Sequence, residues 1–174
     1  MNNPASKPIP ARLAALRDAM QQHGVDAVLV PSADPHLSEY LPEHWQARAW
    51  LSGFTGSAGT LIVTADHAGL WTDSRYFSQA ERQLAGTGIS LMKLQVPHAA
   101  EHLAWLQNNL HESNVLAIAG DSLAVSAQRQ IEKRLSESGA ILRTDLDLPG
   151  AWAAVWQKVG SDLRLAISSE KIDG

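Results

Sequence analysis

Apolar residues recur at helical spacing near the start of the chain and then form a short unbroken run. Four of them share one face of a predicted helix: Ile9, Leu13, Leu16 and Met20. Gly24 stands where a glycine in the left-handed conformation would end that helix. Residues 27–30 are all apolar and include two valines, which predicts a strand buried on both faces of a sheet.

The alternation of helical and strand-like patterns continues along the chain. Further helices are predicted over residues 43–51, 76–84, 99–110 and 126–138, with Ser126 as the N-cap of the last. Further strands are predicted over residues 60–64, 68–72, 89–94, 115–119 and 140–143. This order indicates an α/β fold, with a mixed, mostly parallel sheet of about six strands and helices on both faces. The sheet is mixed because residues 60–72 form a hairpin.

Composition changes near both ends indicate one domain with flanking segments. Residues 1–8 are polar and proline-rich, which predicts a flexible lead-in before a domain over residues 9–145. The sequence Leu148-Pro149-Gly150 breaks the pattern, and we interpret residues 146–174 as a connector or tail. Trp152 or Trp156 is expected to pack against the main body.

Charge and composition exclude several classes of partner and site. The 174 residues carry a formal net charge of −4, which argues against binding of nucleic acid or of an anionic membrane. There is no cysteine, so disulfides, thiolate zinc sites and cysteine nucleophiles are excluded. The sequence has no signal-peptide pattern and no apolar run of about 18 residues, so we expect a cytoplasmic protein.

Three glycines lie three residues apart in the loop before the predicted hairpin: Gly53, Gly56 and Gly59. This spacing predicts a backbone that turns tightly or closely approaches another surface, because glycine lacks a Cβ. Asp73 and Arg75 follow the second strand of the hairpin. We therefore expect the hairpin to deliver two charged side chains to one edge of the sheet.

Asp73 and Arg75 are the candidate binding residues. On an extended segment, residues two apart project to the same side, so the pair could hold the charged end of a peptide through bidentate hydrogen bonds. Alternatively, they form an ion pair that ties the strand end to the next helix, with Asp73 as its N-cap. Both interpretations stay open on the sequence. The neighbouring Trp71 is expected in the core.

Signals for a metal site or a nucleophile are weak. Residues 36–44 include two histidines and two glutamates, but Pro42 prevents a regular helix there. His98 and His102 have i, i+4 spacing, yet the next position after His98 is Ala and not the Glu of zinc hydrolases. Ser57 lacks the nucleophile-elbow pattern and is expected to bond local backbone. We predict no catalytic residue and no metal ligand in this chain.

Three motifs occur in order, VPSADPHLSEY at residues 30–40, LSGFTGSAGT at 51–60 and WTDSRYFSQA at 71–80. Together they closely resemble the N-terminal domain of Xaa-Pro aminopeptidases (aminopeptidase P) of the larger, cytosolic type. That family is related to prolidase and creatinase. The resemblance extends over residues 11–156 and implies a ribonuclease-H-like α/β domain of the creatinase N-terminal type.

The resemblance implies a parent enzyme that removes the first residue of a peptide whose second residue is proline. In the family, catalysis belongs to a C-terminal pita-bread domain that holds two divalent metal ions, expected to be manganese, and that is absent from these 174 residues. Expected partners are this catalytic domain, proline-containing peptides and a second copy in a homodimer. Arg75 matches the arginine of the family motif, so Arg75 and Asp73 are candidate substrate-binding residues near the first-residue pocket.

The chain departs from the family pattern after Trp156. The family continues as Trp-x-x-Arg-Pro, whereas here Gln157-Lys158-Val159 follow the tryptophan. The chain is therefore expected to be a piece of a longer protein, a separately encoded domain or a product with an altered tail. Two functions remain: a non-catalytic domain that shapes substrate access in a metallopeptidase, which we favour, or a stand-alone binding module.

Overall fold

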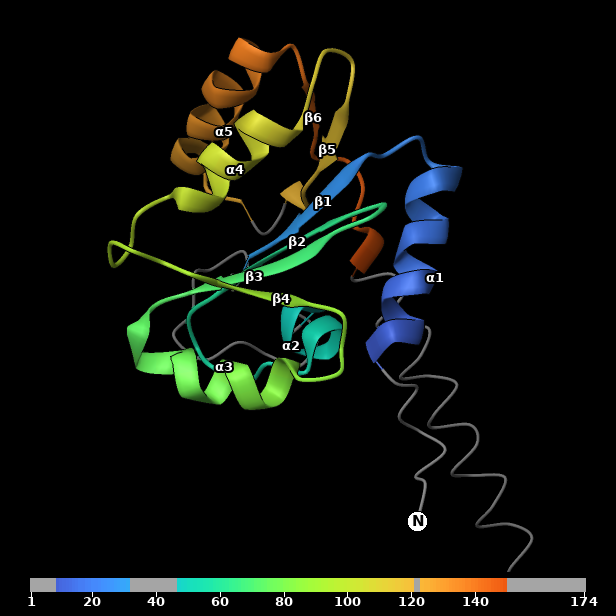
Figure 1. The fold of residues 1–174 in the computed structure, drawn as a ribbon. Coiled ribbons are helices and arrows are strands. Elements are labelled where there is room, and N and C mark those ends of the chain that lie inside the picture. The colour runs from blue at the N-terminus through green and yellow to red at the C-terminus, as the bar shows by residue number, and fades with distance from the viewer. Residues whose placement is uncertain (1–8, 32–46, 121–122, 150–174) are drawn as a thin grey trace, which may run out of the picture.

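A six-stranded sheet lies at the centre of the protein (Figure 1). The structure is a computed structural model that describes residues 9–31, 47–120 and 123–149. The strands are β1 (Ala27–Val30), β2 (Thr60–Thr64), β3 (Ala68–Thr72), β4 (Ser90–Lys93), β5 (Val115–Ala117) and β6 (Ile141–Arg143). The helices are α1 (Ile9–Gln22), α2 (Ala47–Ser52), the short 3-10 helix η2 (Ser74–Tyr76), α3 (Phe77–Leu84), α4 (Glu101–Asn109) and α5 (Val125–Ser138).

The strand order is β4-β3-β2-β1-β5-β6, which places the first strand of the chain inside the sheet. Strand β2 pairs antiparallel with both β1 and β3, and the other three pairings are parallel. The prediction of a mixed, mostly parallel sheet is therefore confirmed. The hairpin turn forms at Asp66 and His67 as predicted, and the Thr64 N–H donates to the His67 carbonyl at 2.8 Å.

Helices cover both faces of the sheet, as the alternation predicted. Helices α1, α2 and α3 lie on one side and α4 and α5 on the other (Figure 1). Side chains of β1 alternate between the two faces of the sheet, so Val28 and Val30 pack in the first apolar cluster and Ala27 and Leu29 pack in the second. Both faces of the strand are therefore buried beneath helices. Trp71 is buried in the second cluster, which confirms its predicted place in the core.

The observed element boundaries lie close to the predicted ones, with one wrong cap. Gly24 and Gly139 have φ angles of +64° and +75°, as expected for residues that end helices. The N-cap of α5 is Ala124 and not Ser126, because Ala124 is the residue with extended backbone before the first helical turn. Its side chain makes no capping hydrogen bond.

Several predictions lie outside the described residues or reach beyond them. They concern the lead-in over residues 1–8, the loop and helix start over 32–46 and the tail from 150 onward, with Trp152 and Trp156. Leu148, three residues past the predicted domain boundary, is buried in the first apolar cluster. None of the described helices combines the length and the apolarity needed to cross a bilayer.

Candidate functional site

The glycine loop begins where α2 ends. Gly53 has a φ of +72°, and its N–H donates to the Ala49 carbonyl at 2.8 Å. Ser52 closes the same helix end, because its Oγ donates to the Arg48 carbonyl at 2.7 Å and accepts from the Phe54 N–H at 3.1 Å. The first glycine therefore supplies the left-handed conformation that turns the chain out of α2.

The next two glycines are sites of close approach. A Cβ on Gly56 would lie 2.3 Å from Cζ of Phe54 and 2.8 Å from Cδ1 of Tyr76. A Cβ on Gly59 would lie 2.6 Å from Nη1 of Arg48. Because real Cβ atoms do not approach other atoms this closely, the loop can pass these side chains only with glycine at positions 56 and 59.

Arg48 is a buried cation beneath the glycine loop, with only 6% of its surface exposed. Its Nη2 donates to the Gly56 carbonyl at 2.6 Å, and its guanidinium lies 5.1 Å from the centroid of the Phe54 ring. Among the described residues, its Nε and Nη1 have no hydrogen-bond partner. Burial lowers the pKa of Arg48 to about 10, an effect partly offset by Tyr76. Sequence analysis did not single out this residue.

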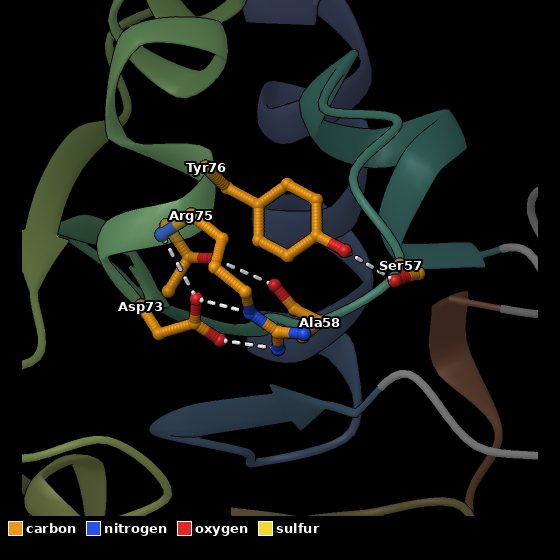
Figure 2. Close-up of polar contacts among 6 residues, drawn as sticks. Ser57, Ala58, Asp73, Arg75 and Tyr76 are labelled. Atoms are coloured by element: carbon orange, nitrogen blue, oxygen red, sulfur yellow. Dashed lines mark hydrogen bonds and ion pairs between the residues drawn. The ribbon is translucent and has the colours of Figure 1, made fainter.

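Two side-chain contacts fasten the loop to the end of the hairpin (Figure 2). The Ser57 Oγ and the Tyr76 hydroxyl lie 2.6 Å apart. The Thr72 hydroxyl donates to the Ala58 carbonyl at 2.6 Å. The expectation that Ser57 bonds local backbone is therefore wrong, because its partner is the hydroxyl of Tyr76 in η2, the 3-10 helix that follows the hairpin.

Asp73 and Arg75 pair where β3 ends (Figure 2). The Asp73 carboxylate accepts from Arg75 Nε at 2.9 Å and from Nη2 at 2.8 Å, and it caps η2 by accepting from the Arg75 N–H at 3.1 Å. The prediction that both residues lie on an extended segment is wrong, because Arg75 belongs to η2. The carboxylate side chain is only 7% exposed, whereas the Arg75 side chain is 62% exposed.

This geometry fixes the charge state of the pair. The hydrogen bonds from Arg75 are the largest cause that holds the pKa of the Asp73 carboxyl below its usual range, and they raise the pKa of Arg75. The stabilisation by Asp73 is therefore present above the usual carboxyl pKa and is lost only as the pH falls through the lowered value. Near neutral pH, the site presents an oriented and outward-facing guanidinium.

Helix α3 holds the glycine loop from a third direction. The Thr55 N–H donates to Oε1 of Gln83 at 3.0 Å, and the Thr55 hydroxyl accepts from Gln79 and Gln83 at 3.0 and 2.9 Å. The loop, the hairpin end and the start of α3 are thus joined in one assembly. Sequence analysis grouped only its glycines with Asp73 and Arg75.

The structure separates the two histidines with helical spacing. His98 has a φ of +61° in the loop before α4, whereas His102 lies within the helix, so the pair does not share a helical face. Burial lowers the pKa of His102. No group of three or more metal-ligating side chains occurs within residues 9–31, 47–120 and 123–149.

Comparison with known proteins identifies a family. The family described as Creatinase/Prolidase N-terminal domain matches residues 12–146. A protein of Laccaria bicolor named Probable Xaa-Pro aminopeptidase P is 45% identical over 125 residues, which is 72% of this chain and 19% of that protein. Xaa-Pro aminopeptidase 2 of Rattus norvegicus is 52% identical over 87 residues, or 47% of this chain and 13% of the relative. The chain therefore spans about a fifth or less of the length of these relatives.

Solved structures share the fold. X-prolyl aminopeptidase from Caenorhabditis elegans, a cytosolic enzyme with a di-nuclear active site, aligns with a TM-score of 0.75 and 31% identity over 83% of this chain and 25% of that one. The N-terminal domain of the cytoplasmic peptidase PepQ from Mycobacterium tuberculosis aligns with a TM-score of 0.61 and 22% identity over 82% of this chain and 98% of that one. The chain belongs to the creatinase/prolidase N-terminal domain family, and its relatives are Xaa-Pro aminopeptidases.

Proposed function

We propose that this chain is the non-catalytic N-terminal domain of a cytoplasmic Xaa-Pro aminopeptidase. In this proposal it shapes the access of peptides to a dinuclear metal site in a C-terminal catalytic domain of the same protein. Support comes from the family match over residues 12–146 and from the di-nuclear, cytosolic enzyme of similar fold. The two metal ions would activate water and polarise the scissile carbonyl in that second domain.

The observation that carries the proposal is the exposed guanidinium of Arg75. Asp73 holds Nε and Nη2, and within the described residues Nη1 makes no hydrogen bond. A cation fixed in orientation but open on one side can bind a carboxylate or a carbonyl of a peptide at little entropic cost. Arg75 would thus orient the peptide near the first-residue pocket, while the glycine loop and Tyr76 keep its support rigid.

The isolated chain is expected to show no turnover of an Xaa-Pro dipeptide in the presence of manganese. The reason is that none of the sequence motifs supplies a complete acid–base or nucleophile set, and the described residues hold no group of three or more metal-ligating side chains. Release of the first residue is measured by chromatography, with the protein encoded by the whole reading frame as the positive control. Stoichiometric binding of two divalent ions and cleavage of the dipeptide by the 174-residue chain would contradict the proposal. A stop codon directly after Gly174 in the gene would instead favour the alternative, a stand-alone binding module.

Replacing Arg75 with alanine in the full-length protein is expected to lower kcat/KM about tenfold, the loss of about one hydrogen bond to a charged group. The thermal midpoint should fall by only a small amount, because Asp73 keeps its hydrogen bond from the backbone N–H of residue 75 and the lost side chain is 62% exposed. Arg143→Ala is the control, since Arg143 at the end of β6 also pairs with a carboxylate two residues away, Asp145, with an Nη2–Oδ2 distance of 2.7 Å, although Asp145 is exposed. Equal kinetics for both variants, or a fall only in the thermal midpoint of Arg75→Ala, would assign Arg75 a structural role.

A further inference from the structure

The ring of Tyr76 links the glycine loop to the exposed guanidinium of Arg75 (Figure 2). The two residues are consecutive in η2, and Cζ of Arg75 lies 5.3 Å from the centroid of the Tyr76 ring. A cation and the face of an aromatic ring attract each other at this distance. The ring is therefore a second contact of the guanidinium, in addition to the hydrogen bonds from Nε and Nη2 to Asp73.

Three contacts hold the Tyr76 ring. It meets the ring of Phe54 edge to face, with centroids 6.0 Å apart and an interplanar angle of 88°. The backbone of Gly56 passes so close that a Cβ there would lie 2.8 Å from Cδ1 of the tyrosine. The hydroxyl lies 2.6 Å from the Ser57 Oγ. Within the described part of the chain, the aromatic carbons thus contact Phe54 and Gly56, and the hydroxyl end is held by Ser57.

The contact between the two hydroxyls lies at the surface. Ser57 is exposed and Tyr76 is half-buried, whereas Phe54 and Gly56 are buried. Water can replace either hydroxyl when an exposed hydrogen bond breaks, so this bond adds little to the stability of the fold. Its main effect is to restrict the ring against which the Arg75 guanidinium lies.

We infer that Ser57 is a positioning residue for Arg75 and that it acts through Tyr76. The inference rests on the proposed function, in which Arg75 orients the bound peptide. The Ser57 hydroxyl restricts the tyrosine ring, and the ring restricts the guanidinium beyond its hydrogen bonds with Asp73. The free Nη1 is thereby oriented before a peptide arrives, which lowers the entropic cost of binding.

Ser57→Ala is expected to lower kcat/KM of the full-length protein for an Xaa-Pro peptide about threefold, the effect of one neutral hydrogen bond. Tyr76→Phe removes the same bond and keeps the ring, so it should cause a similar loss, and the double variant should lose no more than either single variant. Ser57→Thr retains a hydroxyl and should restore the activity. Each loss should fall on the same parameter, kcat or KM, that changes in Arg75→Ala.

Two further variants separate positioning from a general loosening of the loop. Ser57→Ala combined with Arg75→Ala should have the kcat/KM of Arg75→Ala, because the serine hydroxyl has no effect without the guanidinium. Thr55→Val removes another hydroxyl of the same loop, which binds two glutamines of α3 and not Tyr76. It should lower kcat/KM less than Ser57→Ala does.

Three results would overturn the inference. They are an unchanged kcat/KM in Ser57→Ala, a loss from Ser57→Ala that persists in the Arg75→Ala background, and a loss in Thr55→Val that equals or exceeds the loss in Ser57→Ala. Failure of the proposed function would be distinguishable, because it would appear as an unchanged kcat/KM in Arg75→Ala itself.

Discussion

Replacing Gly56 with alanine is expected to lower the free energy of unfolding by about 3 kcal/mol, near the upper end for overpacking a rigid site. The added Cβ would lie 2.3 Å from Cζ of Phe54, and Cδ1 of Tyr76 is only 2.8 Å away. Both neighbours are ring atoms, and the two rings meet edge to face at 6.0 Å, so neither can move independently. Urea unfolding followed by tryptophan fluorescence measures the change.

Gly24→Ala is the matched control for this prediction. Gly24 has a φ of +64°, and a Cβ there would meet no atom within 4 Å. Its substitution should therefore cost only the backbone strain of about 1 kcal/mol. If Gly56→Ala were no more destabilising than Gly24→Ala, the loop could shift away from Phe54 and Tyr76, and its close packing would not be a requirement of the fold.

Replacing Arg48 with alanine is expected to lower the free energy of unfolding by about 3 kcal/mol. The change removes the side chain that packs on Phe54 and leaves the buried Gly56 carbonyl without its donor. Chemical denaturation measures this difference as well. The effect is large because Arg48 is buried, with only 6% of its surface exposed.

Arg48→Met separates packing from charge at the same position. Methionine keeps most of the aliphatic volume against Phe54 but carries no charge, and none of the three ion pairs among the described residues involves Arg48. We therefore expect Arg48→Met to be more stable than Arg48→Ala by about 1 kcal/mol or more. The opposite order would mean that the packing of this side chain on Phe54 does not stabilise the fold, because neither variant carries a charge.

The fold could be predicted because burial and backbone geometry leave local marks in the sequence. The apolar run of β1 is buried on both faces, and Gly24 and Gly139 end their helices with positive φ angles. The exception, Ser126, shows that a suitable side chain near a helix start does not fix the cap. The cap is fixed by the residue at which the backbone becomes extended, and here that residue is Ala124.

The candidate site could be predicted only in part. Asp73 and Arg75 are marked by their place after a strand, but nothing local distinguishes a three-residue 3-10 helix from extended backbone. The partner of Ser57 is Tyr76, 19 residues away, and no spacing rule relates them. In the sequence, nothing distinguishes Arg48 from an ordinary polar residue on the surface of a short helix. Only the tertiary structure shows that it is buried.

The inner position of β1 has a consequence for folding during synthesis. Its N-terminal neighbour Asp26 exchanges hydrogen bonds with Val115, and the two residues are 89 positions apart. At about 5–20 residues per second, a ribosome needs about 5–20 s to supply that second half of the sheet. During this interval the edge of β1 that later pairs with β5 stays open even after β2 has paired with the other edge, which leaves an apolar strand exposed to aggregation.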